Sequence, residues 1–360
     1  MRDVVIVGGR IPGLALALWL LRSGRRVTVV DRGIVPGRID GLSAAPASLS
    51  AGLFFHHTER WHGQEAARTA ASELEAAVAA ATELAQDLDV AVQPSTVAIM
   101  TSDNHEAFWV RYESMAMNRA ELRPEFDDEQ RLPWPVRPYL EQPGQLIDPV
   151  ALRDRLVEAV LDAGGQLRDE VPEAGVRVSA TPWPVTDPLL LRPRLKRSTW
   201  QWAEITGLEL DRVWTGIDDG GVLLIPSADG ALVGARDVDP VAWVGERGPQ
   251  VEVRRRWESS AAESREALPF AGALGPTTSG RGDYVLAGHG PWDLSLGLAA
   301  ARQLHGAITG ATQDLPWAPQ RTVRPETIGR AAWGATRLKL NLNSVTPFPK
   351  APRYRSTHHR

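Results

Sequence analysis

The 360-residue chain has no cysteine, very little lysine and no long uninterrupted hydrophobic run. The absence of cysteine excludes disulfide bonds, thiolate nucleophiles, cysteine-ligated zinc and any cofactor attached through cysteine. Lysine occurs only at Lys196, Lys339 and Lys350 among 40 basic residues, which we attribute to genome composition rather than to mechanism. Because no apolar stretch approaches the roughly 18 residues of a membrane helix, we expect no membrane span.

The composition is that of a globular chain, with 43% hydrophobic and 23% charged residues. The length is sufficient for two interlocked domains. The apolar segment near the N-terminus follows a strand and a glycine turn and lacks a basic leader and a small-residue cleavage site. We therefore do not interpret it as a signal peptide, and we expect a cytoplasmic location.

The segment Val4–Leu14, together with Asp31, is the most informative feature of the chain. It predicts a buried strand, a glycine turn and an apolar helix, followed by a second strand that ends in an acid. Gly8 permits the tight turn, Gly13 lets helix and strand pack closely, and the helix N-terminus offers N–H groups to a pyrophosphate. A carboxylate at Asp31 can bind a ribose and would repel a 2′-phosphate, which favours FAD or NAD.

Arg10 stands where the second glycine of the G-x-G-x-x-G pattern is expected. At that position the backbone passes closest to the phosphates. An arginine side chain there could point away from the pyrophosphate or pair with it, and pairing is electrostatically favourable. We expect dinucleotide binding to survive; the alternative is a Rossmann-like βαβ unit that binds nothing.

Charge is concentrated at the C-terminal end. From Arg321 onward nine basic residues face a single acid, Glu326, although the whole chain carries a net charge of −4. We expect this tail to pack on the acidic body or to reach a partner subunit or a second copy of the chain. Nucleic-acid binding is not expected, because the tail lacks regularly interleaved aromatic residues.

Other sequence patterns predict the remaining elements. In chain order, we expect a small-residue loop over 43–52, a helix over 65–87, a strand over 90–100, a helix over 104–117, a connection over 122–145, a helix over 149–161, short strands within 185–255, a strand over 283–287 and a helix over 294–308. Asp148 is expected to cap the helix that Pro149 opens.

Two residue types invite functional interpretations. His56, His57 and His62 do not have the spacing of a known metal-ligand set, so we expect no metal site. Thirteen tryptophans are many for this length, and six of them fall within 183–257. They would either line an aromatic pocket or fill the core.

Five segments follow one another in a specific order: the βαβ unit, 48–52, 144–152, 222–235 and 283–290. In this order they resemble the D-amino-acid oxidase/glycine oxidase superfamily of FAD-dependent oxidoreductases. The resemblance implies an α/β fold, in which a Rossmann-like FAD-binding domain interlocks with a mixed β-sheet substrate domain. It assigns 1–60, 145–183 and 265–315 to the FAD-binding domain, 61–144 and 184–264 to the substrate domain, and 316–360 to the basic tail.

The resemblance also implies which residues contact FAD. They are Gly8, Gly9, Arg10, Gly13, Asp31, Arg32, Ser48, Ser50, Ala51, Gly52, Val171, Gly288, Leu294, Ser295 and Leu296. His289, Trp292 and Asp293 are the candidate catalytic residues, on the turn that would meet the flavin and substrate. A structural turn histidine and a packing tryptophan are the alternatives.

The helix expected from Leu294 would direct its N-terminal N–H groups at the flavin, where its dipole would stabilise the reduced anion. Asp293 is a departure, because the family usually has glycine there and an acid would oppose that anion. Its alternative role is to cap the helix. Ala261 is a second departure. It stands where relatives often carry a carboxylate-binding arginine, which argues against a simple free amino acid as substrate.

Three functions are compatible with these observations. The first is an FAD-dependent oxidase or dehydrogenase that converts the C–N bond of an amine or amino-acid-like substrate to an imine, in specialised metabolism. The second is a flavin-dependent monooxygenase, which the Arg10 turn would suit. The third is a degenerate accessory or binding subunit with weak or no flavin, which the several departures and the short 162–180 segment favour.

Overall fold

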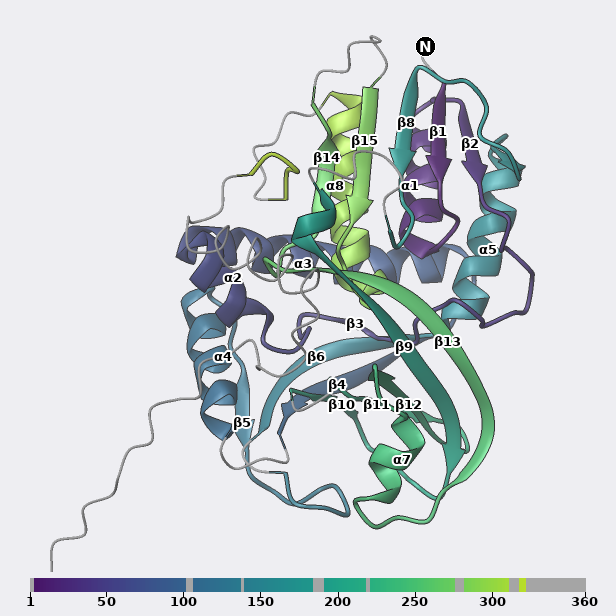
Figure 1. The fold of residues 1–360 in the computed structure, drawn as a ribbon. Helices are drawn as coiled ribbons and strands as arrows, with labels where there is room; N and C mark the ends of the chain where they lie inside the picture. The colour runs from purple at the N-terminus through teal and green to yellow at the C-terminus, as the bar shows by residue number, and fades with distance from the viewer. Residues whose placement is uncertain are drawn as a thin grey trace, which may run out of the picture.

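The computed structural model describes residues 3–101, 106–136, 139–183, 191–217, 221–275, 282–310 and 317–321. These residues form two sheets, one above the other in Figure 1, with helix α3 crossing the middle of the molecule. The long strands β9 and β13 form a curved ribbon that connects the upper part to the lower part (Figure 1). The predicted α/β fold is confirmed.

The upper sheet has six strands in the order β14-β15-β8-β1-β2-β7. Their bounds are β1 Val4–Val7, β2 Val27–Val30, β7 Gln166–Arg168, β8 Val176–Ser179, β14 Phe270–Ala273 and β15 Gly282–Ala287. All neighbours are parallel except β14 and β15. The carboxyl ends of β1, β8 and β15 therefore meet at one edge, which is where parallel α/β sheets bind ligands.

Helices cover the upper sheet and separate it from the lower one. They are α1 Ile11–Arg22, α3 Gln64–Asp87, α5 Pro149–Asp162 and α8 Leu298–Thr309. Helix α1 packs against both α5 and α8, and α3 packs against α8. The predicted cap of α5 is confirmed, because the Asp148 carboxylate accepts hydrogen bonds from the N–H groups of Val150 and Ala151.

The lower sheet is mixed, with the order β13-β9-β12-β11-β10-β4-β6-β3 and with β5 beside β6. Its strands are β3 Ala47–Ser48, β4 Val92–Met100, β5 Glu125–Asp127, β6 Tyr139–Ile147, β9 Leu195–Thr206, β10 Val213–Gly216, β11 Leu223–Ser227, β12 Gly230–Arg236 and β13 Glu252–Ser264. The short helices α2 Phe54–His62, α4 Ala107–Arg119 and α7 Pro240–Gly245 and the 3-10 turn η1 Arg192–Arg194 complete the fold.

Two expectations for the lower sheet are wrong. The segment expected to be a connection over 122–145 contains β5 and most of β6. Pro143 and Gly144 lie inside β6, and a Cβ at Gly144 would lie 2.7 Å from Val97 Cγ2, so close strand packing requires glycine there. The range 185–255 contains the short strands β10, β11 and β12, as expected, but also the long strand β9, which pairs with β13 along most of its length.

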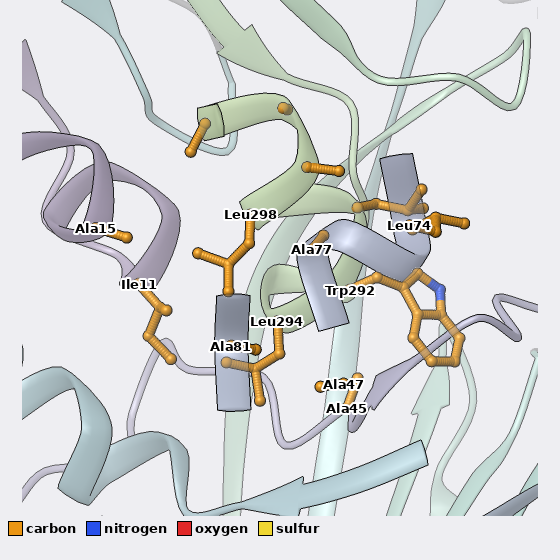
Figure 2. Close-up of a cluster of buried hydrophobic side chains, with 14 of the residues drawn as sticks. Ile11, Ala15, Ala45, Ala47, Leu74, Ala77, Ala81, Trp292, Leu294 and Leu298 are labelled. Carbon is orange, nitrogen blue, oxygen red and sulfur yellow. The ribbon is translucent and has the colours of Figure 1, made fainter. Parts of the chain in front are cut away.

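The apolar core passes between the two sheets around the start of α8. Figure 2 shows Leu294 and Leu298 among side chains of α1 and α3, with Ala45 and Ala47 nearby. Trp292 belongs to the same buried cluster. In the lower sheet Trp200, Trp202 and Trp257 stack face to face, so most of the aromatic surface packs the core.

The last described segment, 317–321, lies against β14. The Ala271 N–H donates to the carbonyl oxygen of Trp317, whose side chain is fully buried. Arg321 and Arg194 both pair with the Glu266 carboxylate, and both guanidinium groups lie over the Phe270 ring. The rest of the predicted basic tail lies outside the described residues. Within the described ranges no helix is long and apolar enough to cross a membrane.

Candidate functional site

The glycine turn after β1 has the close packing that its sequence predicts. Gly8 has φ +119°, and a Cβ there would lie 2.5 Å from the Ala180 carbonyl oxygen. A Cβ on Gly13 would lie 2.2 Å from the Gly8 carbonyl oxygen. Neither position tolerates a side chain, so both glycines are required to bring α1 against the strand edge.

Asp31 ends β2 and is fixed at this turn. Its carboxylate accepts hydrogen bonds from the N–H groups of Gly9 and Gly33, each at 2.6 Å. Each oxygen therefore keeps a lone pair that a ribose hydroxyl can use. Arg32 donates to the Asp169 carbonyl oxygen, and Val171 lies half exposed between β7 and β8.

Arg10 is the N-cap residue of α1, and its side chain is buried. Its Nε donates to Asp293 Oδ2 at 3.0 Å, and its Nη2 lies 2.8 Å from the same oxygen. Its Nη1 donates to the Ser260 carbonyl oxygen at 2.7 Å. Arg10 replaces the second glycine of the pattern, and Asp293 replaces the glycine expected at position 293. These two departures from the pattern thus bind each other.

Asp293 is almost fully buried, and its second oxygen binds His289 Nε2 at 3.0 Å. Burial alone would raise the pKa of Asp293, but the Arg10 charge and the His289 hydrogen bond hold it below its ordinary value. An ionised carboxylate only accepts hydrogen bonds, so His289 donates to it through Nε2–H. The three side chains form a buried Arg10–Asp293–His289 network.

The helix expected from Leu294 begins differently. Residues Asp293–Gly297 form a π-helical turn, η2, and α8 starts only at Leu298. Trp292 is the N-cap of this turn, and Asp293 forms no side-chain capping bond. The capping role considered for Asp293 is therefore wrong, because both of its oxygens are engaged by Arg10 and His289.

The small-residue loop lies next to this turn. The Ser48 hydroxyl accepts a hydrogen bond from the Ser50 N–H, which fixes the loop, and both serines are buried. Ala51 and Gly52 follow, and both line a cavity that also touches η2 through Leu296. The structure thus brings the 48–52 segment and the 288–296 segment together.

This cavity has a volume of about 280 Å³ and lies where the two sheets meet. One wall consists of predicted residues: Ala51, Gly52, Gly288, His289, Trp292 and Leu296. The opposite wall comes from the lower sheet and α2, and it includes His57, Trp200, Thr215, Arg236 and Glu263. The sequence analysis considered Trp200 as one of the tryptophans that could line a pocket and His57 only as a metal ligand, and it did not select Thr215, Arg236 or Glu263.

Arg236 and Glu263 form the charged part of the cavity wall. Arg236 Nη1 donates to Glu263 Oε2 at 2.6 Å. Glu263 Oε1 accepts from the Ser198 hydroxyl at 3.0 Å and from Trp200 Nε1 at 3.3 Å. The sequence signal was weak, because Glu263 is one of several charged residues of β13 and the strand of Arg236, β12, is not its neighbour in the sheet.

The three histidines considered as metal ligands do not form a site. Burial lowers the pKa of His57 to about 4, helped by His56 and Arg60, so His57 is neutral in the cavity wall. His62 binds the Glu266 carbonyl oxygen instead. Over the described ranges, no group of histidine and acidic side chains is arranged to hold a metal.

Comparison with known proteins agrees with this architecture. The sequence model of the FAD dependent oxidoreductase family matches residues 3–305. No protein among the curated sequences matches the chain.

Solved structures show the same fold at low identity. A glycine oxidase from Geobacillus kaustophilus is 14% identical, with a TM-score of 0.66 and coverage of 90% of this chain and 99% of its own. L-proline dehydrogenase from P. horikoshii is also 14% identical, with a TM-score of 0.65 and coverage of 88% and 96%. Iminodiacetate oxidase from Chelativorans sp. BNC1 is 15% identical, with a TM-score of 0.63 and coverage of 88% and 99%.

The residues present fit FAD, the cofactor of the matched family. Gly8 and Gly13 form the closely packed turn that a pyrophosphate would require, and Asp31 keeps lone pairs that a ribose could use. Near the carboxyl edge of the upper sheet, some buried polar atoms lack a hydrogen-bond partner within the described ranges: the hydroxyls of Ser50, Ser179 and Ser295, and His289 Nδ1. Buried polar groups normally have partners, so these atoms are available to the polar groups of a cofactor.

Proposed function

Because the chain belongs to the family of FAD-dependent oxidoreductases, we propose that it oxidises the C–N bond of a small amine or amino-acid-like substrate to an imine. The observation that carries this proposal is the cavity between the two sheets. Its wall combines a guanidinium group, the imidazole rings of His57 and His289, and two tryptophans beside the turn that follows β15.

The cavity has the size and chemistry of a small-molecule site. About 280 Å³ accommodates an amino-acid-sized molecule, and binding sites combine apolar walls with a few well-placed polar groups. Trp200 and Trp292 supply apolar surface that excludes water. Imine formation removes a hydrogen from carbon and a proton from nitrogen, and it requires orientation and a dry site more than a strong acid–base pair.

Bound FAD would supply the acceptor for the two electrons that this oxidation releases. The residues that would hold it are those of the phosphate turn and the buried serines, Gly8, Gly13, Asp31, Ser50 and Ser295. The dipoles of η2 and the buried backbone N–H groups around Ser295 favour negative charge at this point.

Arg236 is the group we propose for an acidic substituent of the substrate. Ala261 replaces the arginine that the resemblance led us to expect, but Arg236 reaches the cavity from β12 instead. Glu263 holds one of its terminal nitrogens, which restricts the guanidinium to one orientation. A fixed guanidinium is suited to a carboxylate. This supports an amino-acid-like substrate over a plain alkylamine.

Product analysis tests the proposal. FAD-loaded protein is incubated with glycine, L-proline or iminodiacetate in air, and hydrogen peroxide and the carbonyl compound from imine hydrolysis are measured. We expect carbonyl product from at least one amine without NADPH. Carbonyl formation that occurs only after an artificial electron acceptor is added, and without peroxide, would indicate a dehydrogenase. Oxygenated product that requires NADPH would contradict amine oxidation and support a monooxygenase.

A further inference from the structure

The phosphate turn contains a positive charge that the chain itself neutralises. Arg10 lies at the N-terminus of α1, where the helix dipole and backbone N–H groups already attract anions. Its guanidinium is bound by the Asp293 carboxylate, a protein anion contributed from the other end of the described chain. An anion-binding position therefore already has an anionic partner.

The contacts of Arg10 with Asp293 are only partly hydrogen bonds. Nε and Nη1 form hydrogen bonds to Asp293 and Ser260. Nη2 lies 2.8 Å from Asp293 Oδ2 in the ion pair, but its N–H groups form no hydrogen bond within the part of the chain that the structure describes. The ion pair therefore leaves hydrogen-bonding capacity on this buried guanidinium that a phosphate oxygen can use.

We propose that Asp293 competes with the FAD pyrophosphate for Arg10, so that FAD binding is coupled to weakening of the Arg10–Asp293 ion pair. This inference rests on the family's cofactor and not on amine oxidation, so either can fail alone. His289 remains bound to Asp293 when Arg10 turns to the phosphates, and it keeps the carboxylate hydrogen-bonded. The pair therefore reduces FAD affinity while it preserves the buried network.

The variants Asp293→Asn and Asp229→Asn test the competition. Asn keeps the shape of Asp293 but removes its charge, which leaves the guanidinium to the phosphates. Asp229→Asn removes one negative charge from an exposed ion pair with Arg254 and serves as the matched control. The dissociation constant for FAD is measured by quenching of flavin fluorescence at several NaCl concentrations, and folding is checked by thermal unfolding.

We expect Asp293→Asn to lower the dissociation constant about tenfold, since one charge-assisted hydrogen bond is gained, and to make binding more sensitive to salt. Asp229→Asn should bind FAD as the wild type does. Weaker or unchanged binding by a folded Asp293→Asn protein overturns the proposal, as does equal tightening by Asp229→Asn.

A second variant tests the proposal without leaving an unpaired buried charge, which could prevent folding. Arg10→Gly with Asp293→Gly restores both glycines expected at these positions and leaves neither charge unpaired. It should bind FAD with less dependence on salt than Asp293→Asn, because the guanidinium is gone. A salt dependence equal to that of Asp293→Asn in this double variant contradicts pairing of Arg10 with the pyrophosphate.

Discussion

Arg10 and Asp293 are 283 positions apart in the chain and form a buried ion pair, with 2.8 Å between Arg10 Nη2 and Asp293 Oδ2. Each residue alone departs from the sequence pattern of an FAD-binding protein. Together they neutralise each other, which explains why one departure accompanies the other. The pair joins the phosphate turn to the π-helical turn beside the cavity.

Replacement of Arg10 by methionine should destabilise the fold. It leaves the Asp293 carboxylate buried without its cation, which typically costs about 3–5 kcal/mol in free energy of unfolding. Urea unfolding at neutral pH measures the loss. The double variant Arg10→Met/Asp293→Leu, which removes both charges, should recover most of the lost free energy of unfolding. A loss in the double variant equal to the sum of the losses in the two single variants would contradict a direct pairing.

The Arg10–Asp293 pair also predicts how the stability of the protein depends on pH. In the wild type the folded pKa of Asp293 lies below its ordinary 3.8, so its stabilisation is present above pH 3.8 and is lost as pH falls through the folded pKa. In Arg10→Met, burial is no longer opposed by the guanidinium, and the Asp293 pKa rises. The stability deficit of Arg10→Met should therefore shrink as pH falls from neutral. A deficit that stays constant from pH 7 to 4 would contradict this assignment.

Glu113 predicts that stability changes with pH in the opposite direction. This carboxylate is buried at the first turn of α2 and accepts the N–H groups of Phe55 and His56. Burial raises its pKa to about 8, only partly opposed by those hydrogen bonds. The folded state thus binds the proton more tightly, and stability falls as pH rises from about 4.5 toward 8, by a few kcal/mol at most.

Glu113→Gln should flatten this dependence, as measured by urea unfolding at pH 5, 6.5 and 8. The exposed Glu121 provides a matched control, since Glu121→Gln makes the same substitution at a carboxylate that is not buried. A Glu113→Gln protein that keeps the wild-type slope between pH 5 and 8 would show that another group titrates.

Removal of Arg236 should weaken substrate binding selectively. In Arg236→Leu the Michaelis constant for a carboxylate-bearing amine should rise about tenfold to a hundredfold, as expected for loss of a charge-assisted hydrogen bond. The constant for an amine without a carboxylate should change little. Arg254→Leu removes an exposed guanidinium on β13 and is the control. Equal effects on both kinds of amine would contradict carboxylate binding by Arg236.

The segment 317–321 should contribute to stability independently of the residues after it. Truncation after Gly310 removes Trp317 and Arg321, uncovers Phe270 and leaves Glu266 with Arg194 alone. Truncation after Arg321 keeps these contacts. We expect the first protein to melt at least several degrees below the second, given the loss of a fully buried tryptophan. Equal melting temperatures would contradict the contribution of this segment.

Local patterns predicted the βαβ turn and the Asp148 cap, because each is determined by residues close in sequence. The fold as a whole was predicted from the family resemblance that the order of the five segments carries. The predictions were wrong where tertiary contacts override local preference, as with Pro143 and Gly144 inside β6 or the π-helical start at Asp293.

The site was predicted only in part for a similar reason. The 48–52 and 288–296 segments meet as the resemblance implied. The Arg10–Asp293 pair and the Arg236–Glu263 pair join residues that are distant in the chain, and a single sequence gives no signal for such pairing. These residues come together only when the two sheets pack against each other.

The absorption spectrum of the FAD-loaded protein under anaerobic conditions tests the central claim most directly. Amine oxidation delivers two electrons to the cofactor, so addition of a carboxylate-bearing amine should abolish the flavin band near about 450 nm. The band should return when oxygen or another acceptor is admitted. A band that stays unchanged with every amine, in protein that retains stoichiometric FAD reducible by dithionite, would contradict the account.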